Sequence, residues 1–146
     1  MPRRSFRTLT TILCVDDNEA GLSARKMLLE AAGYRVLIAD HPRKALEILN
    51  QNTIDLAILD FRMPEMDGCQ LGNEIRSRGI GIPLIMLTGW LSEVPGSCVF
   101  SRTLQKGEDP TTLLESIATA ITETPNCSEC NYARATRTCP ARGCEE

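Results

Sequence analysis

The feature that most constrains the fold is the stretch over residues 54–68, where a strongly apolar run ends in a carboxylate. Residues 56–59 are aliphatic, Asp60 follows them, and Pro64 and Asp67–Gly68 then supply turn residues. A short apolar run closed by turn residues predicts a strand buried on both faces, as in a parallel sheet. Asp60 is therefore expected at the carboxyl edge of such a sheet, where α/β folds place their ligands. An isolated aspartate could equally cap the next turn. Residues elsewhere in the chain are therefore needed to distinguish a ligand site from a cap.

Four further strands are predicted, and they alternate with helices. The apolar runs lie at residues 10–15, 34–39, 55–60, 82–88 and 98–104. Helical spacing of apolar residues predicts helices that begin at Asn18, Asp40, about Cys69 and Asp109. This alternation predicts a doubly wound, five-stranded parallel sheet with right-handed crossovers and helices on both faces. The pattern weakens after the fourth strand, where Pro95 and Gly96 predict a short or irregular fourth helix.

Length and composition are those of one ordinary globular domain, with 146 residues, 42% hydrophobic and 24% charged. We expect a disordered basic segment at residues 1–9, a folded domain at 10–124 and a cysteine-rich tail at 125–146. The predicted domain carries 10 basic and 16 acidic residues, which argues against direct binding of DNA. No apolar run has the length of about 20 residues that a membrane helix needs, and no signal-peptide core follows the N-terminus. We therefore expect a cytoplasmic protein.

Polar side chains stand at four of the predicted strand ends. Asp16 and Asp17 follow the first strand, Asp60 ends the third, Thr88 ends the fourth and Lys106 follows the fifth. Three carboxylates close together repel one another unless a cation holds them, and oxygen ligands with open positions suit Mg²⁺. A hydroxyl and an ammonium beside them could bind a phosphoryl group. Each residue alone could be a cap, a strand residue or a solvated charge, but the combination favours a site for an aspartyl phosphate.

At these motifs the sequence resembles the receiver domain of two-component response regulators. The resemblance covers about residues 11–123 and is carried by Val15–Asp17, Leu59–Gly68, Leu87–Gly89 and Gln105–Gly107. It implies a flavodoxin-like fold, with Asp60 as the phosphoacceptor of a sensor histidine kinase or phosphotransfer protein. It also implies that Asp17, Asp60 and the backbone carbonyl of Arg62 ligate Mg²⁺, that Asp16 acts through water, and that Thr88 and Lys106 bind the phosphoryl group.

Three features depart from the family pattern. Gly107 follows Lys106 where the family usually has proline, so the loop after Lys106 is expected to differ. Thr103 stands where the family commonly has an aromatic switch residue, which puts that switch in doubt. Only 18 positions separate Thr88 from Lys106, and the missing length falls in the fourth helix. In the family, the face formed by the fourth helix and the fifth strand usually carries dimerisation or output contacts. We expect that this face is remodelled here and that dimerisation through it fails.

The tail contains four of the seven cysteines, at positions Cys127, Cys130, Cys139 and Cys144. The first pair has the spacing of a zinc knuckle, and four thiolates could hold Zn²⁺ in a tetrahedral site. A disordered tail with oxidisable thiols is the alternative, and an iron–sulfur site is a further reading of the same spacing.

The sequence thus predicts a phosphoacceptor response regulator that is not an enzyme in the ordinary sense and that signals to an unknown downstream protein. A receiver-like interaction module that no longer cycles phosphate is the main alternative. A small hydrolase that uses Asp60 as nucleophile is a third, but Arg62 stands where a second acid would be needed.

Overall fold

The computed structural model describes residues 10–93, 100 and 102–123. Five parallel strands form one sheet in the order β2-β1-β3-β4-β5. The strands are β1 (Thr11–Val15), β2 (Arg35–Ala39), β3 (Leu56–Asp60), β4 (Leu84–Thr88) and β5 (Arg102–Gln105). The helices are α2 (Glu19–Ala31), α3 (Pro42–Gln51), α4 (Gly68–Ser77) and α5 (Pro110–Glu123). This is the doubly wound, flavodoxin-like fold that the sequence predicts, with strands somewhat shorter than the apolar runs.

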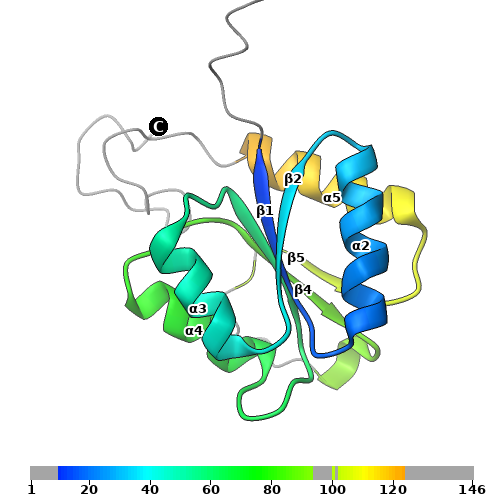
Figure 1. The fold of residues 1–146 in the computed structure, drawn as a ribbon. Coiled ribbons are helices and arrows are strands. Elements are labelled where there is room, and N and C mark those ends of the chain that lie inside the picture. The colour runs from blue at the N-terminus through cyan, green and yellow to red at the C-terminus, as the bar shows by residue number, and fades with distance from the viewer. Residues whose placement is uncertain (1–9, 94–99, 101, 124–146) are drawn as a thin grey trace, which may run out of the picture.

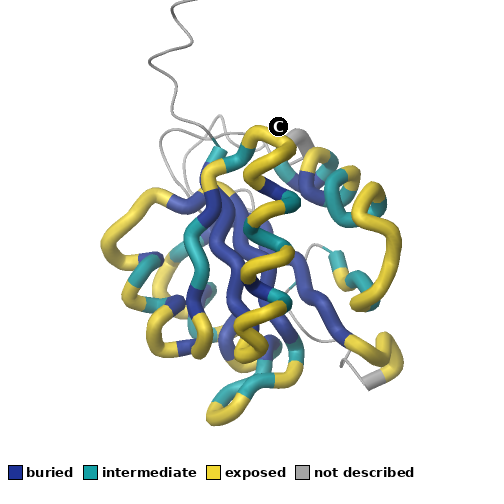
Figure 2. The backbone as a smooth tube through the Cα atoms, turned by 45° about the vertical axis from the view of Figure 1, so that its right-hand side comes forward, coloured by how far each residue is buried: buried dark blue, intermediate teal, exposed yellow. Residues whose placement is uncertain are grey.

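The helices cover both faces of the sheet, with α2 and α5 on one side and α3 and α4 on the other (Figure 1). Side chains alternate along each strand, so β1 sends Leu13 and Val15 into the core under α3 and α4. Ile12 and Cys14 point the opposite way, into the core that includes Leu29 of α2 and Ile117 of α5. β1, β3 and β4 are buried at every position, as Figure 2 shows by the dark central strands. These three strands therefore form a fixed platform for the residues at their ends.

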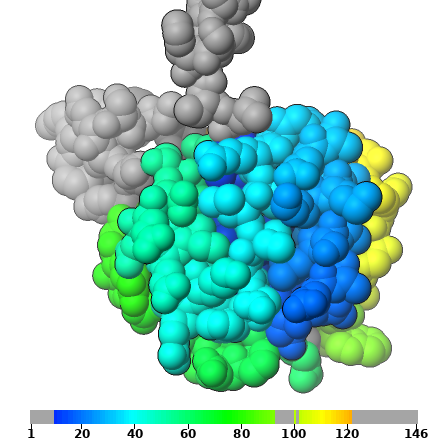
Figure 3. Space-filling model, in the orientation of Figure 1, coloured from blue at the N-terminus to red at the C-terminus, as the bar shows by residue number. Residues whose placement is uncertain are grey.

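In the space-filling view, atoms of the blue-to-cyan part of the chain cover most of the face turned to the viewer (Figure 3). The aliphatic core below them suits a sequence with only 4% aromatic residues. Cys14 is fully buried, and burial raises the pKa of its thiol to about 12. It therefore acts as a small apolar core residue, as its place in a buried strand predicts.

The caps of α2 and α3 were both predicted from the sequence, and one of the two predictions is correct. The side chain of Asn18 accepts a hydrogen bond from the Gly21 backbone N–H at 3.0 Å, as predicted for the start of α2. The prediction that Asp40 caps α3 is wrong. His41 is the cap, and its Nδ1 accepts from the Lys44 N–H at 3.4 Å, because Pro42 occupies the first helical turn.

The connection after β4 begins with a single 3₁₀ turn, η1 (Leu91–Glu93). Residues 94–99 and 101 lie outside the described residues, so no α-helix is described between β4 and β5. Trp90 and Leu91 expose 68% and 46% of their surfaces at the start of this connection. Thr103, at the position of the missing aromatic switch, is exposed on β5.

Candidate functional site

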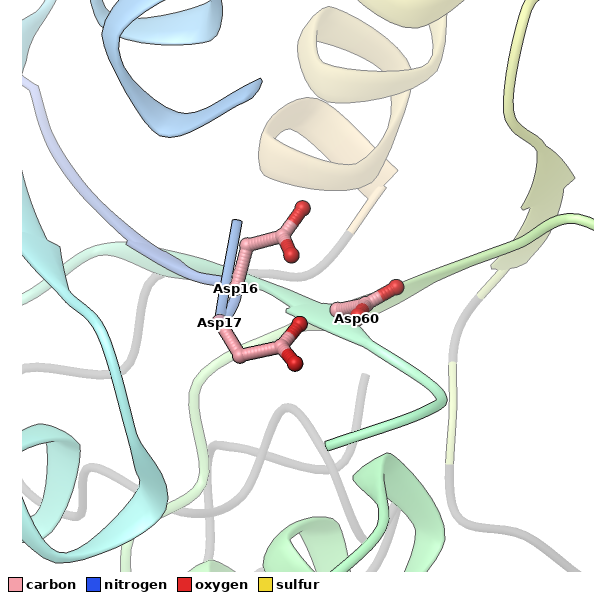
Figure 4. Close-up of side chains that lie close together, drawn as sticks. All are labelled: Asp16, Asp17 and Asp60. Atoms are coloured by element: carbon pink, nitrogen blue, oxygen red, sulfur yellow. The ribbon is translucent and has the colours of Figure 1, made fainter. Parts of the chain in front are cut away.

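The three predicted acids meet at the carboxyl edge of the sheet. β1 and β3 are hydrogen-bonded neighbours with Val15 opposite Leu59, so the residues that follow these partners come together. Oxygen atoms of Asp16, Asp17 and Asp60 all lie within 4.8 Å of one another. Figure 4 shows the Asp16 and Asp17 carboxylates extending from the end of β1 toward the side where the Asp60 carboxylate lies. Asp16 and Asp60 are buried, whereas Asp17 is exposed to solvent.

The loop after Asp60 is shaped by a very close approach of the backbone. The Gly68 N–H donates to the Phe61 carbonyl at 2.8 Å, which closes residues 61–68 into a compact turn. A Cβ atom at Gly68 would lie 2.6 Å from the Asp60 carbonyl oxygen and 2.9 Å from the Met86 sulfur. Only glycine fits there, which gives a physical reason for the Asp67–Gly68 pair in the sequence motif.

Lys106 reaches the acids from the end of β5. Its Nζ lies 2.6 Å from Asp60 Oδ1 and 3.4 Å from Asp16 Oδ2. The Lys106 backbone N–H also donates to the Thr88 carbonyl at 2.7 Å, so β4 fixes where the lysine begins. Gly107 follows with φ +91°, a left-handed conformation that proline cannot adopt, and no described peptide bond is cis. Gly107, which replaces the proline usual in the family, therefore forms a turn that requires glycine.

Thr88 lies at the end of β4, one strand from Asp60, and is almost completely buried. Its hydroxyl donates to the Trp90 carbonyl and accepts from the Trp90 N–H, both at 3.2 Å. Arg62 lies in the wall of an open cavity of about 460 Å³ that Asp17 and Met63 also line. The structure therefore brings the acids and Lys106 into contact and places Thr88 and Arg62 around them.

One charged residue of the site was missed by the sequence analysis. Arg25 of α2 lies with its guanidinium 3.5 Å from Asp16 Oδ2, and only 12% of its side chain is exposed. The sequence does indicate that Arg25 points inward, because it lies three residues after the buried Leu22 and four before the buried Leu29, on the same side of the helix. A charged residue on the apolar stripe of a helix needs a buried partner of opposite charge.

The electrostatic environment separates the two buried acids. Burial disfavours the charged form of Asp16, but the Asn18 N–H, Lys106 and Arg25 together lower its pKa. Burial raises the pKa of Asp60 to about 6, although the hydrogen bond from Lys106 opposes this and the charge of Asp16 adds to it. Of these two acids, Asp16 is thus held as a carboxylate, while burial disfavours the charged form of Asp60.

The acid cluster fits a divalent cation. Three carboxylate oxygens within 4.8 Å supply hard oxygen ligands, and the exposure of Asp17 leaves room for water on the open side. This composition is typical of a magnesium site beside a phosphoryl group. It is a poor match for a structural zinc site, which prefers nitrogen and sulfur ligands in a closed tetrahedron.

A family model for the response regulator receiver domain matches residues 12–118. The chain belongs to this family. Among curated proteins, the receiver domain is 42% identical over 77 residues to the transcriptional regulatory protein GlrR of Escherichia coli K12. It is 39% identical over 82 residues to the sensor histidine kinase GacS of Pseudomonas protegens. These matches cover 53% of the chain in both cases, but only 17% of GlrR and 9% of GacS.

Solved receiver domains share the fold over most of the chain. A CheY-like receiver domain from Methanospirillum hungatei superposes with a TM-score of 0.74 at 31% identity, over 80% of this chain and 96% of that one. The response regulator TrrA of Thermotoga maritima, solved in complex with Mg²⁺-BeF, gives a TM-score of 0.72 at 25% identity, over 77% and 99%. Receiver domains work with histidine kinases, which makes the kinase the class of partner to consider.

One prediction lies outside the part of the chain that the structure describes. The candidate zinc ligands Cys127, Cys130, Cys139 and Cys144 lie outside the described residues, so the zinc site stays a prediction. Among the described residues, no helix is both long enough and apolar enough to cross a membrane.

Proposed function

We propose that this receiver domain accepts a phosphoryl group on Asp60 from a phosphohistidine of a sensor histidine kinase or phosphotransfer protein. The observation that carries the proposal is the 2.6 Å contact between Lys106 Nζ and Asp60 Oδ1 inside a cluster of three acids. A buried carboxylate that faces one ammonium and two further carboxylates has the composition of a phosphoryl-transfer site.

The transfer forms one bond and breaks one. An oxygen of the ionised Asp60 attacks phosphorus, the bond between phosphorus and the histidine nitrogen breaks, and its electron pair stays on the imidazole. Lys106 would compensate the charge of the arriving phosphoryl oxygens, because its ammonium lies beside the accepting carboxylate at 2.6 Å. The strand ends hold both groups in place before the donor arrives, which reduces the cost of orienting them.

Asp17, Asp60 and the backbone carbonyl of Arg62 would hold Mg²⁺, with Asp16 acting through water. When bound, the cation would neutralise negative charge on the acids and on the phosphoryl oxygens.

Thr88 would exchange its hydrogen bonds with the Trp90 backbone for one to a phosphoryl oxygen. That exchange would carry the signal into residues after β4, where Trp90 and Leu91 already expose apolar surface to a protein partner. In this proposal residues 10–124 form the signalling domain. This domain acts in the cytoplasm and needs no contact with DNA.

Incubation with acetyl phosphate and Mg²⁺, followed by intact-mass measurement, tests the proposal. One added phosphoryl group is expected, and Asp60→Asn should abolish it. Asp40→Asn is the matched control, because Asp40 is an exposed aspartate that follows the edge strand β2. The control should keep the adduct.

The outcomes separate the alternatives. No adduct in the wild-type protein would favour an interaction module that has lost phosphoryl transfer. Continuous release of phosphate without an accumulated adduct would favour a hydrolase that uses Asp60 as nucleophile.

A further inference from the structure

Arg25 lies on the buried face of α2 and ends against an acid of the site. Both of its terminal nitrogens are 3.5 Å from Asp16 Oδ2, and the side chain is only 12% exposed. A guanidinium removed from water is stable only when it is paired. Its position is therefore set by Asp16 and not by solvent.

Asp16 has no oxygen left without a donor from the protein. Lys106 Nζ joins the two Arg25 nitrogens at Oδ2, at 3.4 Å. The other oxygen, Oδ1, accepts the Asn18 backbone N–H at 3.0 Å. With Arg25 and Lys106 both charged, two cations already offset most of the charge of three ionised acids. A divalent cation that enters this cluster therefore meets a site that is partly neutralised from within.

We propose that Arg25 is a resident counter-cation of Asp16, which competes with the divalent cation and lowers the affinity of the site for Mg²⁺. This inference rests on the metal site of the proposed function, and it concerns a residue that the family resemblance does not assign. Arg25 acts by electrostatic competition, because it offsets the charge of Asp16, the acid that would act on the metal through water beside Asp17 and Asp60.

The space beside Arg25 allows its guanidinium to move away from Asp16 when Mg²⁺ binds. A cavity of about 400 Å³ lies between α2 and the start of α5, which cover the same face of the sheet (Figure 1). The small residues Gly21 and Ala24 leave it open on the α2 side, and Arg25 lines it. Glu108 and Asp109 line the opposite part and offer carboxylates. Arg25 can thus leave Asp16 when Mg²⁺ binds and still find a partner of opposite charge.

Titration of the whole chain with Mg²⁺ tests the competition, by calorimetry or by the fluorescence of Trp90, the one tryptophan in the sequence. Arg25→Met removes the charge but keeps an apolar stem, and its Mg²⁺ affinity should rise about three- to tenfold. Arg25→Lys, which keeps the charge, should stay nearer to the wild-type affinity. Should Arg25→Met lose the helical circular dichroism signal, Arg25→Gln takes its place in the comparison.

Lys26→Met is the matched control. Lys26 is the next residue of α2, but it pairs with Glu30 at 2.9 Å on the exposed side of the helix. Its removal changes the net charge by the same amount and should leave the Mg²⁺ affinity nearly unchanged. An unchanged or weaker affinity in Arg25→Met, or an equal gain in Lys26→Met, overturns the proposal.

The result is separable from the test of phosphorylation. A wild-type adduct without a gain in Mg²⁺ affinity in Arg25→Met overturns this inference alone. A gain in affinity without any adduct supports the inference and overturns the proposed function. If neither the wild-type protein nor Arg25→Met binds Mg²⁺, both fail.

Discussion

At the scale of single residues, Gly68 shows how closely the site depends on backbone packing. A methyl group there would overlap the Asp60 carbonyl oxygen at 2.6 Å and press on Met86 at 2.9 Å. The backbone at Asp60 belongs to a fully buried strand and has no free direction to move. We predict that Gly68→Ala lowers the free energy of unfolding by about 1–3 kcal/mol, measured by urea denaturation. It should also reduce the phosphoryl adduct, because Asp60 itself is displaced.

Gly89→Ala is the comparison for this substitution. Gly89 follows Thr88 at the same edge of the sheet, but a Cβ atom there would have no neighbour within 4 Å. Its substitution should change the unfolding free energy by less than about 0.5 kcal/mol. Equal losses in both variants would contradict the packing argument.

Residue-level reasoning from the sequence found the acids and the lysine but not the arginine. Asp16, Asp17, Asp60 and Lys106 were predicted because each ends or follows a strand, and strand ends converge in a parallel sheet. Arg25 lies in the middle of a helix, where a charged residue is usually assigned to the solvent side. Only its place between the buried residues Leu22 and Leu29 shows that it points inward.

At the scale of elements, α4 is anchored directly behind the acid site. The Asp67 side chain accepts the Gln70 N–H at 2.8 Å, and the Gln70 side chain accepts the Asp67 N–H at 2.9 Å. This reciprocal capping box satisfies two backbone donors that the helix would otherwise leave unpaired. We predict that Asp67→Ala lowers the free energy of unfolding by about 1 kcal/mol.

Asp67→Asn controls for the loss of charge, because asparagine caps helices about as well as aspartate. It should keep nearly all of the stability in the same urea measurement. An equal loss in both variants would mean that the charge of Asp67, and not its hydrogen bond, stabilises the helix start.

The order and type of the helices and strands could be predicted from the sequence. The residues at which they begin and end were predicted less accurately. Short apolar runs that are closed by turn residues or charges indicate buried strands, which explains why β1, β3 and β4 were found. The start of α3 was misplaced by one residue, since both Asp40 and His41 can supply a cap and only the backbone decides between them. The connection after β4 gave only a weak pattern, and much of it lies outside the described residues.

At the scale of the whole molecule, the chain spans a small share of its curated relatives, 17% of GlrR and 34% of a response regulator MprA from Mycobacterium. The fold was predictable, because it follows from the alternation of strands and helices over the entire domain. The kinase and the output protein were not, because specificity for a partner resides in surface residues that have no fixed pattern. The acid cluster nevertheless makes a prediction about the stability of the whole domain.

That prediction concerns pH in the absence of metal. Burial raises the pKa of Asp60 to about 6, although Lys106 opposes the rise, whereas an unfolded aspartate titrates at about 3.9. A raised pKa means that the folded state binds the proton more tightly than the unfolded state. The contribution of Asp60 to stability is therefore fully present below about pH 3.9 and is lost as the pH rises through about 6. The lowered pKa of Asp16 acts in the opposite sense but is present in both proteins compared below.

Asp60→Asn removes the ionisation and should be more stable than the wild-type protein at neutral pH in the presence of EDTA. The difference in unfolding free energy should grow between about pH 4 and pH 7, by on the order of 2 kcal/mol. Urea denaturation across this range measures it, with Asp40→Asn as the exposed-aspartate control. A constant difference would show that Asp60 ionises as easily in the folded as in the unfolded chain. Saturating Mg²⁺ should then reduce or reverse the advantage of Asp60→Asn, because the cation stabilises the ionised carboxylate that the variant lacks.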